Sequence, residues 1–347
     1  MRKLQEIAEA LRGYDGEPLT FMEVCGTHTA SISQNGIADM LSPKIKLVSG
    51  PGCPVCVTVA SYIDRLTELS REENTCVVTF GDMLRVRGSR QSLREAAAEG
   101  GNVRMVYSPI EVIGLALENP GTRYVFAAVG FETTAPVYAI LAEEAVSRGI
   151  SNIRLLTALK TMPAVIDRIC GEPNELSGFI APGHVSVVTG SRAFLPLAEK
   201  YGLPFVVAGF EGGELLAAVY ALVKLKGRAG VYNFYPRAVS EEGNVRAREK
   251  VEKYFEPCDA AWRGMGIIPS SGMRLRKEYA ALDAGSGGLF EDAAFNKGCS
   301  CPDVLTGRLS PTKCPLYGSV CTPDNPQGAC MVSSEGSCFN YFVGKRG

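Results

Sequence analysis

The fold is indicated first by a stretch that reads LTFMEVCGTHT at residues 19–29, and by its counterpart IKLVSGPGCPVC at residues 45–56. Each begins with a short apolar run and continues into a loop of glycine, cysteine and other small residues. Apolar runs of this length, bounded by turn residues, are typical of strands buried on both faces of a parallel sheet. The two stretches therefore predict strands whose ends carry reactive thiols.

The same pattern continues along the first 235 residues. Helix-like stretches of roughly 10–20 residues separate most of the runs, and this alternation predicts βαβ units in the α/β class. Eight strands in 347 residues favour two linked α/β domains over a single sheet. We expect domains at 1–120 and 121–236, divided near the ENPGT turn at 118–122. The six further runs are TCVVTF (75–80), VRMVY (103–107), YVFAAV (124–129), NIRLLTA (152–158), SGFIA (177–181) and LPFVVA (203–208).

The chain changes character after residue 236. SEEGNVRAREKVEKYF at 240–255 predicts one long charged helix with a serine N-cap. Glycine and proline then become frequent, strand signals fade, and cysteines accumulate. We expect 237–347 to comprise this helix and a small domain held together more by a bound metal than by a core.

Composition excludes several classes of protein. Hydrophobic residues make up 46%, charged residues 21%, and the net charge is −1, as in soluble globular proteins. A nucleic-acid or membrane-surface binder would need a basic excess, so neither partner is expected. No apolar run of membrane-spanning length occurs, and the N-terminal residues lack the apolar segment of a signal peptide. We therefore expect a cytoplasmic protein.

The cysteines are unevenly placed. Six of the twelve lie between Cys299 and Cys338. In a reducing compartment such a group indicates metal ligands or redox groups more than structural disulfides. Cys76 and Cys170 lie in apolar stretches and are interpreted as core residues. Cys258 has no assigned role.

Polar and reactive residues follow four of the predicted strands. Ligands of open α/β sheets bind beyond the carboxyl ends of the strands, so these loops are expected to meet at one cleft. Both histidines of the chain lie in them. The candidate residues are Cys25 and His28 after the first strand, Cys53 and Cys56 after the second, Glu132 after YVFAAV, and His184 after SGFIA.

The spacing and surroundings of the two cysteines in the Cys53-Pro54-Val55-Cys56 loop suit redox chemistry. Its two preceding glycines permit a tight turn, and a helix is expected to start at Cys53 or Pro54. A helix N-terminus lowers the pKa of a thiol, and cysteines three positions apart can close a reversible disulfide. A redox pair is the favoured interpretation; half of a zinc site shared with Cys25 or His28, and plain structural thiols, remain alternatives.

Cys25 and His28 admit three interpretations. They could be a thiolate with its base, two metal ligands, or a buried turn whose histidine is satisfied by the backbone. Spacing alone does not separate these, but the neighbouring Cys53 loop favours a functional role.

The C-terminal cluster is the strongest chemical signal. A 4Fe–4S cluster and a structural zinc site each take four thiolates. The wide spacings and the absence of a CxxC pair favour iron–sulfur over zinc, and disulfides least. Six cysteines do not by themselves reveal which four are ligands. They are Cys299, Cys301, Cys314, Cys321, Cys330 and Cys338.

Nearly the whole chain resembles the HypD family of hydrogenase maturation proteins. Many separate motifs occur in the right order, which makes the resemblance specific. They are FMEVCGTHT (21–29), SGPGCPVCV (49–57), GFETTAP (130–136), APGHVS (181–186), GMGIIPSSGMRLRKEY (264–279), CPLYGSVCTP (314–323) and MVSSEGSC (331–338).

The resemblance implies a scaffold on which the Fe(CN)2CO unit of nickel–iron hydrogenases is assembled, with a small HypC-type chaperone and a HypE-type cyanide donor as partners. It implies two α/β domains around a cleft plus a small iron–sulfur domain. The family pattern for the 4Fe–4S ligands selects Cys301, Cys314, Cys321 and Cys338, leaving Cys299 and Cys330 as extra thiols. Ala30 stands where some family members carry a second histidine.

The residues and the resemblance together give one hypothesis. Cys25, with a partner's cysteine, holds the iron; Cys53 and Cys56 cycle between dithiol and disulfide; and the cluster relays electrons to them. His28 and His184 supply protons or hydrogen bonds near neutral pH, and Glu132 positions the metal or the partner. The rivals are a stand-alone iron–sulfur disulfide reductase and a zinc-stabilised interaction module.

Overall fold

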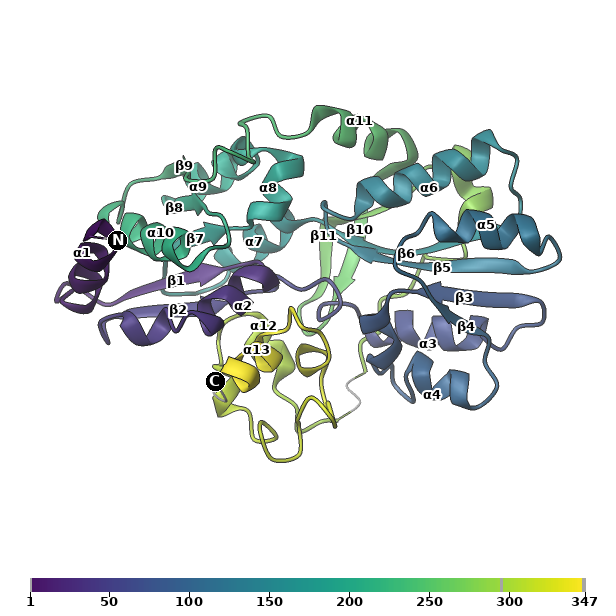
Figure 1. The fold of residues 1–347 in the computed structure, drawn as a ribbon, viewed down its shortest axis with the longest axis horizontal. Coiled ribbons are helices and arrows are strands. Elements are labelled where there is room, and N and C mark those ends of the chain that lie inside the picture. Colours follow the sequence, from purple (N-terminus) through teal and green to yellow (C-terminus); the bar gives the residue numbers. More distant parts are fainter. Residues whose placement is uncertain (1, 294–295, 345–347) are drawn as a thin grey trace.

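The computed structural model describes residues 2–293 and 296–344. Its strands form two sheets, each covered by helices (Figure 1). We call the five-stranded sheet, ordered β2-β1-β7-β8-β9, the first sheet, and the six-stranded sheet, ordered β10-β11-β6-β5-β3-β4, the second sheet. The α/β class with two largely parallel sheets is therefore confirmed.

The first sheet is parallel throughout. Its central strands are mostly apolar and buried on both faces, as expected of a sheet covered on both sides. Phe179 and Phe205, for example, are 0% exposed and stack with ring centroids 4.7 Å apart. Its strands are β1 Leu19–Glu23, β2 Ile45–Ser49, β7 Leu176–Ala181, β8 Pro204–Val207 and β9 Gly230–Asn233.

The second sheet combines four parallel strands with an antiparallel hairpin on the β6 edge. All eight apolar runs of the sequence are found as β1–β8. The strands of this sheet are β3 Thr75–Thr79, β4 Val103–Met105, β5 Arg123–Gly130, β6 Ile153–Lys160, β10 Phe255–Trp262 and β11 Gly266–Leu275.

The helices cover both faces of each sheet. α10 packs on β1, β7 and β8 with α1 outside it, whereas α5 packs on β5 and β6, and α3 packs on β3 (Figure 1). In the described part of the chain no helix is both long and apolar enough to cross a bilayer. The helices are α1 Arg2–Arg12, α2 Gly26–Gln34, α3 Ala60–Leu69, α4 Leu93–Ala98, α5 Glu111–Glu118, α6 Ala135–Ser147, α7 Met162–Cys170, α8 Gly183–Thr189, α9 Leu195–Tyr201, α10 Gly212–Lys224, α11 Val245–Tyr254, α12 Cys301–Leu305 and α13 Ser337–Gly344.

The sheets do not divide the chain where the sequence suggested. β3 pairs with β5, so the turn at 118–122 lies within the second sheet. β1 pairs with β7, so the N-terminal strands belong with residues 176–233. The physical reason is that pairing between strands distant in sequence is decided by packing of whole faces, which local apolar runs do not encode.

The region after residue 236 also differs from expectation. The charged helix α11 begins at Val245 with Asn244 as its N-cap, whose side chain accepts a hydrogen bond from the Ala247 amide at 3.1 Å. The β10–β11 hairpin follows it and extends the second sheet. Strands therefore persist to Leu275, beyond the point where the apolar signal fades.

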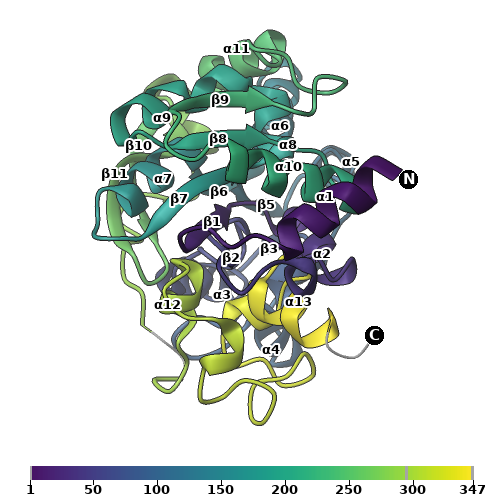
Figure 2. The ribbon, with the colours of Figure 1, turned by 90° about the vertical axis from the view of Figure 1, so that its left-hand side faces the viewer.

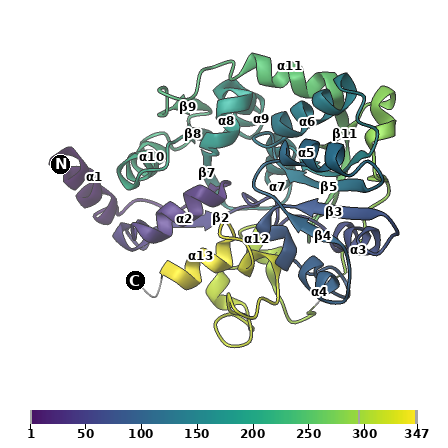
Figure 3. The same cartoon turned by 45° about the vertical axis from the view of Figure 1, so that its right-hand side comes forward.

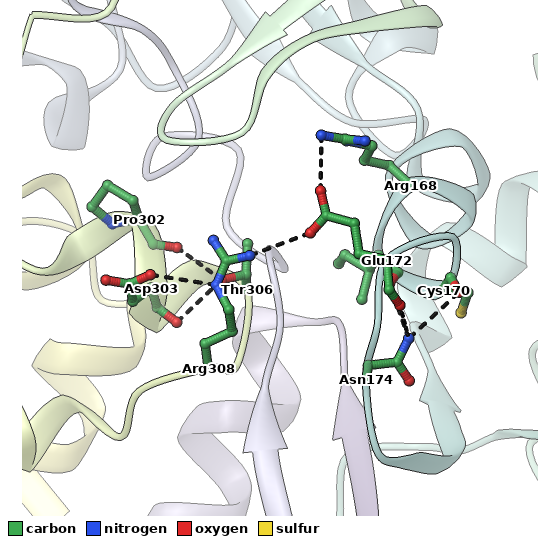
Figure 4. A network of polar contacts seen from close by, with 9 residues as sticks. Arg168, Cys170, Glu172, Asn174, Pro302, Asp303, Thr306 and Arg308 are labelled. Carbon is green, nitrogen blue, oxygen red and sulfur yellow. Dashed lines mark hydrogen bonds and ion pairs between the residues drawn. The ribbon is translucent and has the colours of Figure 1, made fainter.

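The C-terminal segment, residues 296–344, has only short helices and turns and lies beneath β1 and β2 (Figure 2). α13 packs along α2 (Figure 3), and the Ser33 hydroxyl donates to the Asn340 carbonyl at 2.9 Å. On its other side Arg308 lies 3.2 Å from Glu172, which also pairs with Arg168 of α7 at 2.8 Å (Figure 4).

One continuous core joins the two sheets and the C-terminal segment. It contains Val48 of the first sheet and Val125 of the second, and it also contains Cys53, Cys56 and Cys330. The thiols are thus part of the packed interior rather than of a surface loop.

Candidate functional site

Cys25 lies where β1 ends and α2 begins. It is the N-cap residue of α2, and its carbonyl accepts the Thr29 amide at 3.0 Å. The side chain is 7% exposed. Burial raises the pKa of the thiol to about 12, although the backbone N–H groups of His28 and Thr27 at the helix start act in the opposite direction. The site therefore favours a neutral thiol until a cation compensates the thiolate.

Two glycines let neighbouring segments approach Cys25. The Gly26 amide donates to the Gly52 carbonyl at 3.1 Å. A Cβ atom on Gly52 would overlap the backbone of Cys25, and one on Gly26 would overlap Glu335 of the C-terminal segment. The loop that carries Cys53 and the C-terminal segment therefore both pack directly on the Cys25 turn.

Cys53 and Cys56 form a disulfide in this structure. They are 3% and 0% exposed, and the Cys56 amide donates to the Cys53 sulfur at 3.2 Å. The expected helix start at Cys53 or Pro54 is wrong: residues 54–57 form a turn, and the next helix, α3, begins at Ala60. A helix dipole therefore does not act on this pair.

Six cysteines of the C-terminal segment line one small cavity, which we call the six-thiol cavity. Its other lining residues are Val304, Tyr317, Gly328 and Met331, so within the described part of the chain neither a carboxylate nor a histidine borders it. The cysteines are Cys299, Cys301, Cys314, Cys321, Cys330 and Cys338.

The thiols of this cavity interact with one another. The Sγ atoms of Cys301 and Cys330 are 3.1 Å apart. Hydrogen bonds from Cys299 and from Cys330 lower the pKa of the Cys301 thiol. Among the described residues no three metal-binding side chains converge on the geometry of a single ion site.

The donor set of the cavity fits a thiolate-bound cluster. A cavity lined mainly by sulfur atoms, without competing carboxylates among its lining residues, suits iron–sulfur clusters and structural zinc. All six thiols share the cavity, including Cys299 and Cys330, so the lining does not by itself select four ligands.

The disulfide lies between Cys25 and the six-thiol cavity. The Cys56 sulfur is 3.7 Å from the Ala329 carbonyl, and the next residue, Cys330, lines the cavity. Contacts therefore run from the Cys25 turn through Gly52 to the disulfide and on to the cavity.

The two histidines lie against the same ring, Phe210. Its centroid is 4.9 Å from that of His28 and 4.0 Å from that of His184. His28 Nε2 is 3.2 Å from the Ala208 carbonyl and 3.1 Å from the Gly209 carbonyl, so Nε2 carries the hydrogen. Nδ1 is then an acceptor, and it is buried without a hydrogen-bond partner in the described structure.

Of the two roles expected for His28 near neutral pH, supplying protons or supplying hydrogen bonds, its buried position favours hydrogen bonding. Burial lowers its pKa to about 4, so the ring stays neutral at physiological pH. Burial also lowers the pKa of His184. Both rings are therefore suited to hydrogen bonding in the neutral form more than to proton release at pH 7.

Glu132 lies at the end of β5, on the second sheet. Its Oε1 accepts the Met162 amide at the start of α7 at 2.8 Å, and its Oε2 is buried with no partner among the described residues. Burial raises the pKa of this carboxyl to about 7. The hydrogen bond from the Met162 amide ties Glu132 to α7, not to the Cys25 turn.

Sequence reasoning missed Glu23, which precedes Cys25 by two residues. It is 2% exposed, and its carboxylate accepts the Cys25 amide at 3.0 Å and the Thr29 hydroxyl. Burial raises its pKa to about 7. An acidic residue within an otherwise apolar strand was the available signal.

It also missed Arg263, which connects the disulfide loop to the six-thiol cavity. Its amide donates to the Val57 carbonyl at 2.9 Å and its Nε to the Thr58 carbonyl at 2.7 Å. The guanidinium lines a small pocket together with Cys299 and Cys301, and no local sequence pattern marks it.

The fold and the site together define a class: an α/β protein whose buried thiol, buried disulfide and six-thiol cavity follow one another through its core. Comparison with known proteins gives the particular family. The HypD family model, described as the hydrogenase formation hypA family, matches residues 1–344. The chain belongs to this family.

Several relatives match over most of their length. The hydrogenase maturation factor HypD of Azotobacter vinelandii is 44% identical over 334 residues, which cover 93% of this chain and 88% of the relative. HypD of Rhodobacter capsulatus is 40% identical over 352 residues, covering 99% and 93%. A putative hydrogenase expression/formation protein of Methanocaldococcus jannaschii is 40% identical over 353 residues, covering 99% and 96%.

Proposed function

We propose that this protein is a scaffold and redox protein in hydrogenase maturation, and that the Fe(CN)2CO unit is assembled at Cys25. The observation that carries the proposal is the unbroken line of contacts from Cys25 through the Cys53–Cys56 disulfide to the six-thiol cavity. Such a line suits a site where a metal is held and electrons are delivered from one side.

Cys25 has the properties of a metal ligand that ionises only when a cation binds. Burial disfavours its free thiolate, so proton loss is coupled to the arrival of a cation. Soft thiolate suits an iron that carries cyanide and carbon monoxide. A cysteine of a HypC-type chaperone would supply the second thiolate, and a HypE-type protein the cyanide.

The six-thiol cavity would hold a 4Fe–4S cluster through Cys301, Cys314, Cys321 and Cys338. Such a cluster, when bound, supplies single electrons. The Cys53–Cys56 disulfide takes up two electrons and two protons to become a dithiol. Reduction is needed in this chemistry because release of cyanide from a thiocyanate-type carrier requires cleavage of a C–S bond.

The remaining candidate residues have supporting roles. His28 offers a buried hydrogen-bond acceptor, Nδ1. The rings of His28 and His184 both pack against Phe210. Glu23 fixes the Cys25 turn through its backbone amide. Glu132, which contacts α7, would position a partner from the second sheet rather than the iron itself.

The test separates the iron site from the cluster. Cys25→Ser is compared with Cys76→Ser, a buried cysteine of β3 in the other core. Each is purified without oxygen together with the partner proteins. We expect Cys25→Ser to retain about four iron and four acid-labile sulfide per chain but to lose the infrared bands of bound cyanide, whereas Cys76→Ser keeps both. Normal cyanide bands in Cys25→Ser would contradict the assignment.

A stand-alone disulfide reductase is the second candidate, and the contact of the disulfide with Ala329 beside Cys330 favours it. It would turn over a protein disulfide in the absence of the partner proteins and would not need Cys25. One zinc and no sulfide per chain would instead indicate an interaction module held together by metal.

A further inference from the structure

A cavity of about 640 Å³ lies apart from the thiol sites, between β6, the β10–β11 hairpin and residues 280–290. None of the site cysteines described above lines it. Its volume falls in the range of small-molecule sites, which are mostly apolar with few polar groups. The apolar wall includes Val59, Leu159, Met273, Leu275, Leu289 and Phe290.

The distinctive polar group of the cavity is Lys160, the last residue of β6. Its side chain is 3% exposed, and within the described structure its ammonium makes neither an ion pair nor a hydrogen bond. Its ammonium lies over the Trp262 ring, whose centroid is 5.7 Å away. A buried ammonium without an anionic partner is costly, so the site is incomplete as it stands.

The charged groups that face Lys160 are already engaged elsewhere. Asp292 accepts the Ala60 amide at 3.2 Å and the Gly264 amide at 2.8 Å, and its carboxylate lies 3.8 Å from Arg263. The remaining neighbour, Cys258, is a thiol whose pKa is raised by burial and which is therefore neutral.

The acids of the cavity wall are occupied as well. Asp259 accepts the Ser270 amide at 3.0 Å, and Asp283 accepts the Ser286 hydroxyl at 2.5 Å. Arg274, the other cation of the wall, pairs with Glu256 at 2.9 Å. Lys160 is thus the polar group of the cavity that an incoming ligand could satisfy.

We propose that this cavity binds a small organic acid, with its carboxylate paired to Lys160 and its hydrocarbon body against the apolar wall. A carboxylate replaces the hydration that the ammonium has lost, and the hydrocarbon body removes apolar wall from water. An inorganic anion would satisfy only the first requirement, and a neutral amphiphile only the second.

The protonation of Lys160 makes the binding depend on pH. Burial lowers the pKa of this amine to about 8. A carboxylate pairs with the ammonium form, so its affinity is greatest below that pKa and falls as the pH rises above it. Affinity for an uncharged analogue would not follow this pattern.

Hexanoate, hexanamide and inorganic phosphate are the probes for a titration of the full-length protein by calorimetry at pH 7 and pH 9.5. We expect hexanoate to bind at least ten times more tightly than hexanamide or phosphate at pH 7, and to lose at least tenfold in affinity at pH 9.5. In Lys160→Met the preference for the acid should vanish, while Lys46→Met, at an exposed lysine of β2, should keep it.

Equal affinity for hexanoate and hexanamide, or no binding of hexanoate at millimolar concentration, would overturn the proposal. Should Lys160→Met fail to fold, labelling of the wild-type protein tests the same proposal. Reductive labelling with pyridoxal phosphate and borohydride, followed by peptide mapping, should modify Lys160, and hexanoate but not hexanamide should protect it. Labelling at Lys160 that hexanoate leaves unchanged would contradict the proposal.

Discussion

The two thiol regions of this molecule are built in different ways. The Cys25 turn and the disulfide loop stand at the ends of β1 and β2, where ladders of a buried sheet and tight glycine contacts fix the backbone. The six-thiol cavity is enclosed by short helices and turns that lack a sheet of their own. The first region owes its geometry to the fold, whereas under the proposed function the second would depend on the metal that its sulfurs bind.

The largest expected effect is that of metal removal on hydrogen exchange, and it should be confined to the segment that forms the six-thiol cavity. Removal of bound metal by a chelator should raise amide hydrogen exchange in residues 299–344 by about a hundredfold or more, because the segment loses its main cross-link. Amides of β1 and β5 should change little. Equal loss of protection in the sheets and the segment, measured by mass spectrometry, would break the distinction.

A change in the first region should act through the backbone. Gly52→Ala places a methyl group against the Cys25 backbone and should lower the free energy of unfolding by about 3 kcal/mol. Urea unfolding measures this. Gly121→Ala, at a position with open space around the new methyl group, is the control and should be near neutral. An unchanged free energy of unfolding in Gly52→Ala would show that the backbone of the Cys25 turn shifts at little cost to make room for the methyl group.

Glu132, beside the second sheet, should make the free energy of unfolding depend on pH. The pKa of Glu132 is raised from 4.5 to about 7, so the folded state binds its proton more tightly than the unfolded chain. This contribution to stability is complete below the unfolded pKa and is lost as the pH rises through about 7. Wild type should therefore lose about 3 kcal/mol more than Glu132→Gln between pH 4.5 and pH 8.

Urea unfolding at the two pH values tests this, with Glu118→Gln, an exposed residue at the end of α5, as control. The control should follow wild type. Parallel pH profiles for wild type and Glu132→Gln would mean that the carboxyl titrates normally.

The smallest expected effect concerns the ion pair between the C-terminal segment and Glu172, which follows α7. Arg308 and Glu172 are 54% and 37% exposed, so their ion pair should contribute about 0.5 kcal/mol to docking of the C-terminal segment. Arg308→Ala should raise exchange in residues 299–344 only about twofold, and high salt should reduce the difference. Arg148→Ala, which removes an exposed pair within α6, should leave the segment unchanged.

The sequence predicted the eight strands that are continuous apolar runs, because burial on both faces leaves that pattern. It did not predict β10 and β11; β11, for example, reads GIIPSSGMRL and mixes glycine, proline and serine with its apolar residues. Nor could it predict that β1 lies beside β7, because that pairing depends on contacts between residues far apart in the chain.

The candidate site divides in the same way. The rule that ligands bind at strand ends drew attention to the loops of Cys25 and Cys56, and the structure brings these two loops into contact through Gly52. It could not foresee Arg263, whose relevance comes from hydrogen bonds to the carbonyls of Val57 and Thr58. Tertiary contacts of that kind leave no trace in local spacing.

The pairing of β1 with β7 has a consequence for biosynthesis. At a typical rate of elongation, the ribosome releases β7 roughly 10–30 s after β1. During that interval β1 lacks one of its two neighbouring strands, and the loops with Cys25, Cys53 and Cys56 have not yet been enclosed. The nascent chain thus exposes the thiols of Cys25, Cys53 and Cys56 to the cell before the sheet that buries them has formed.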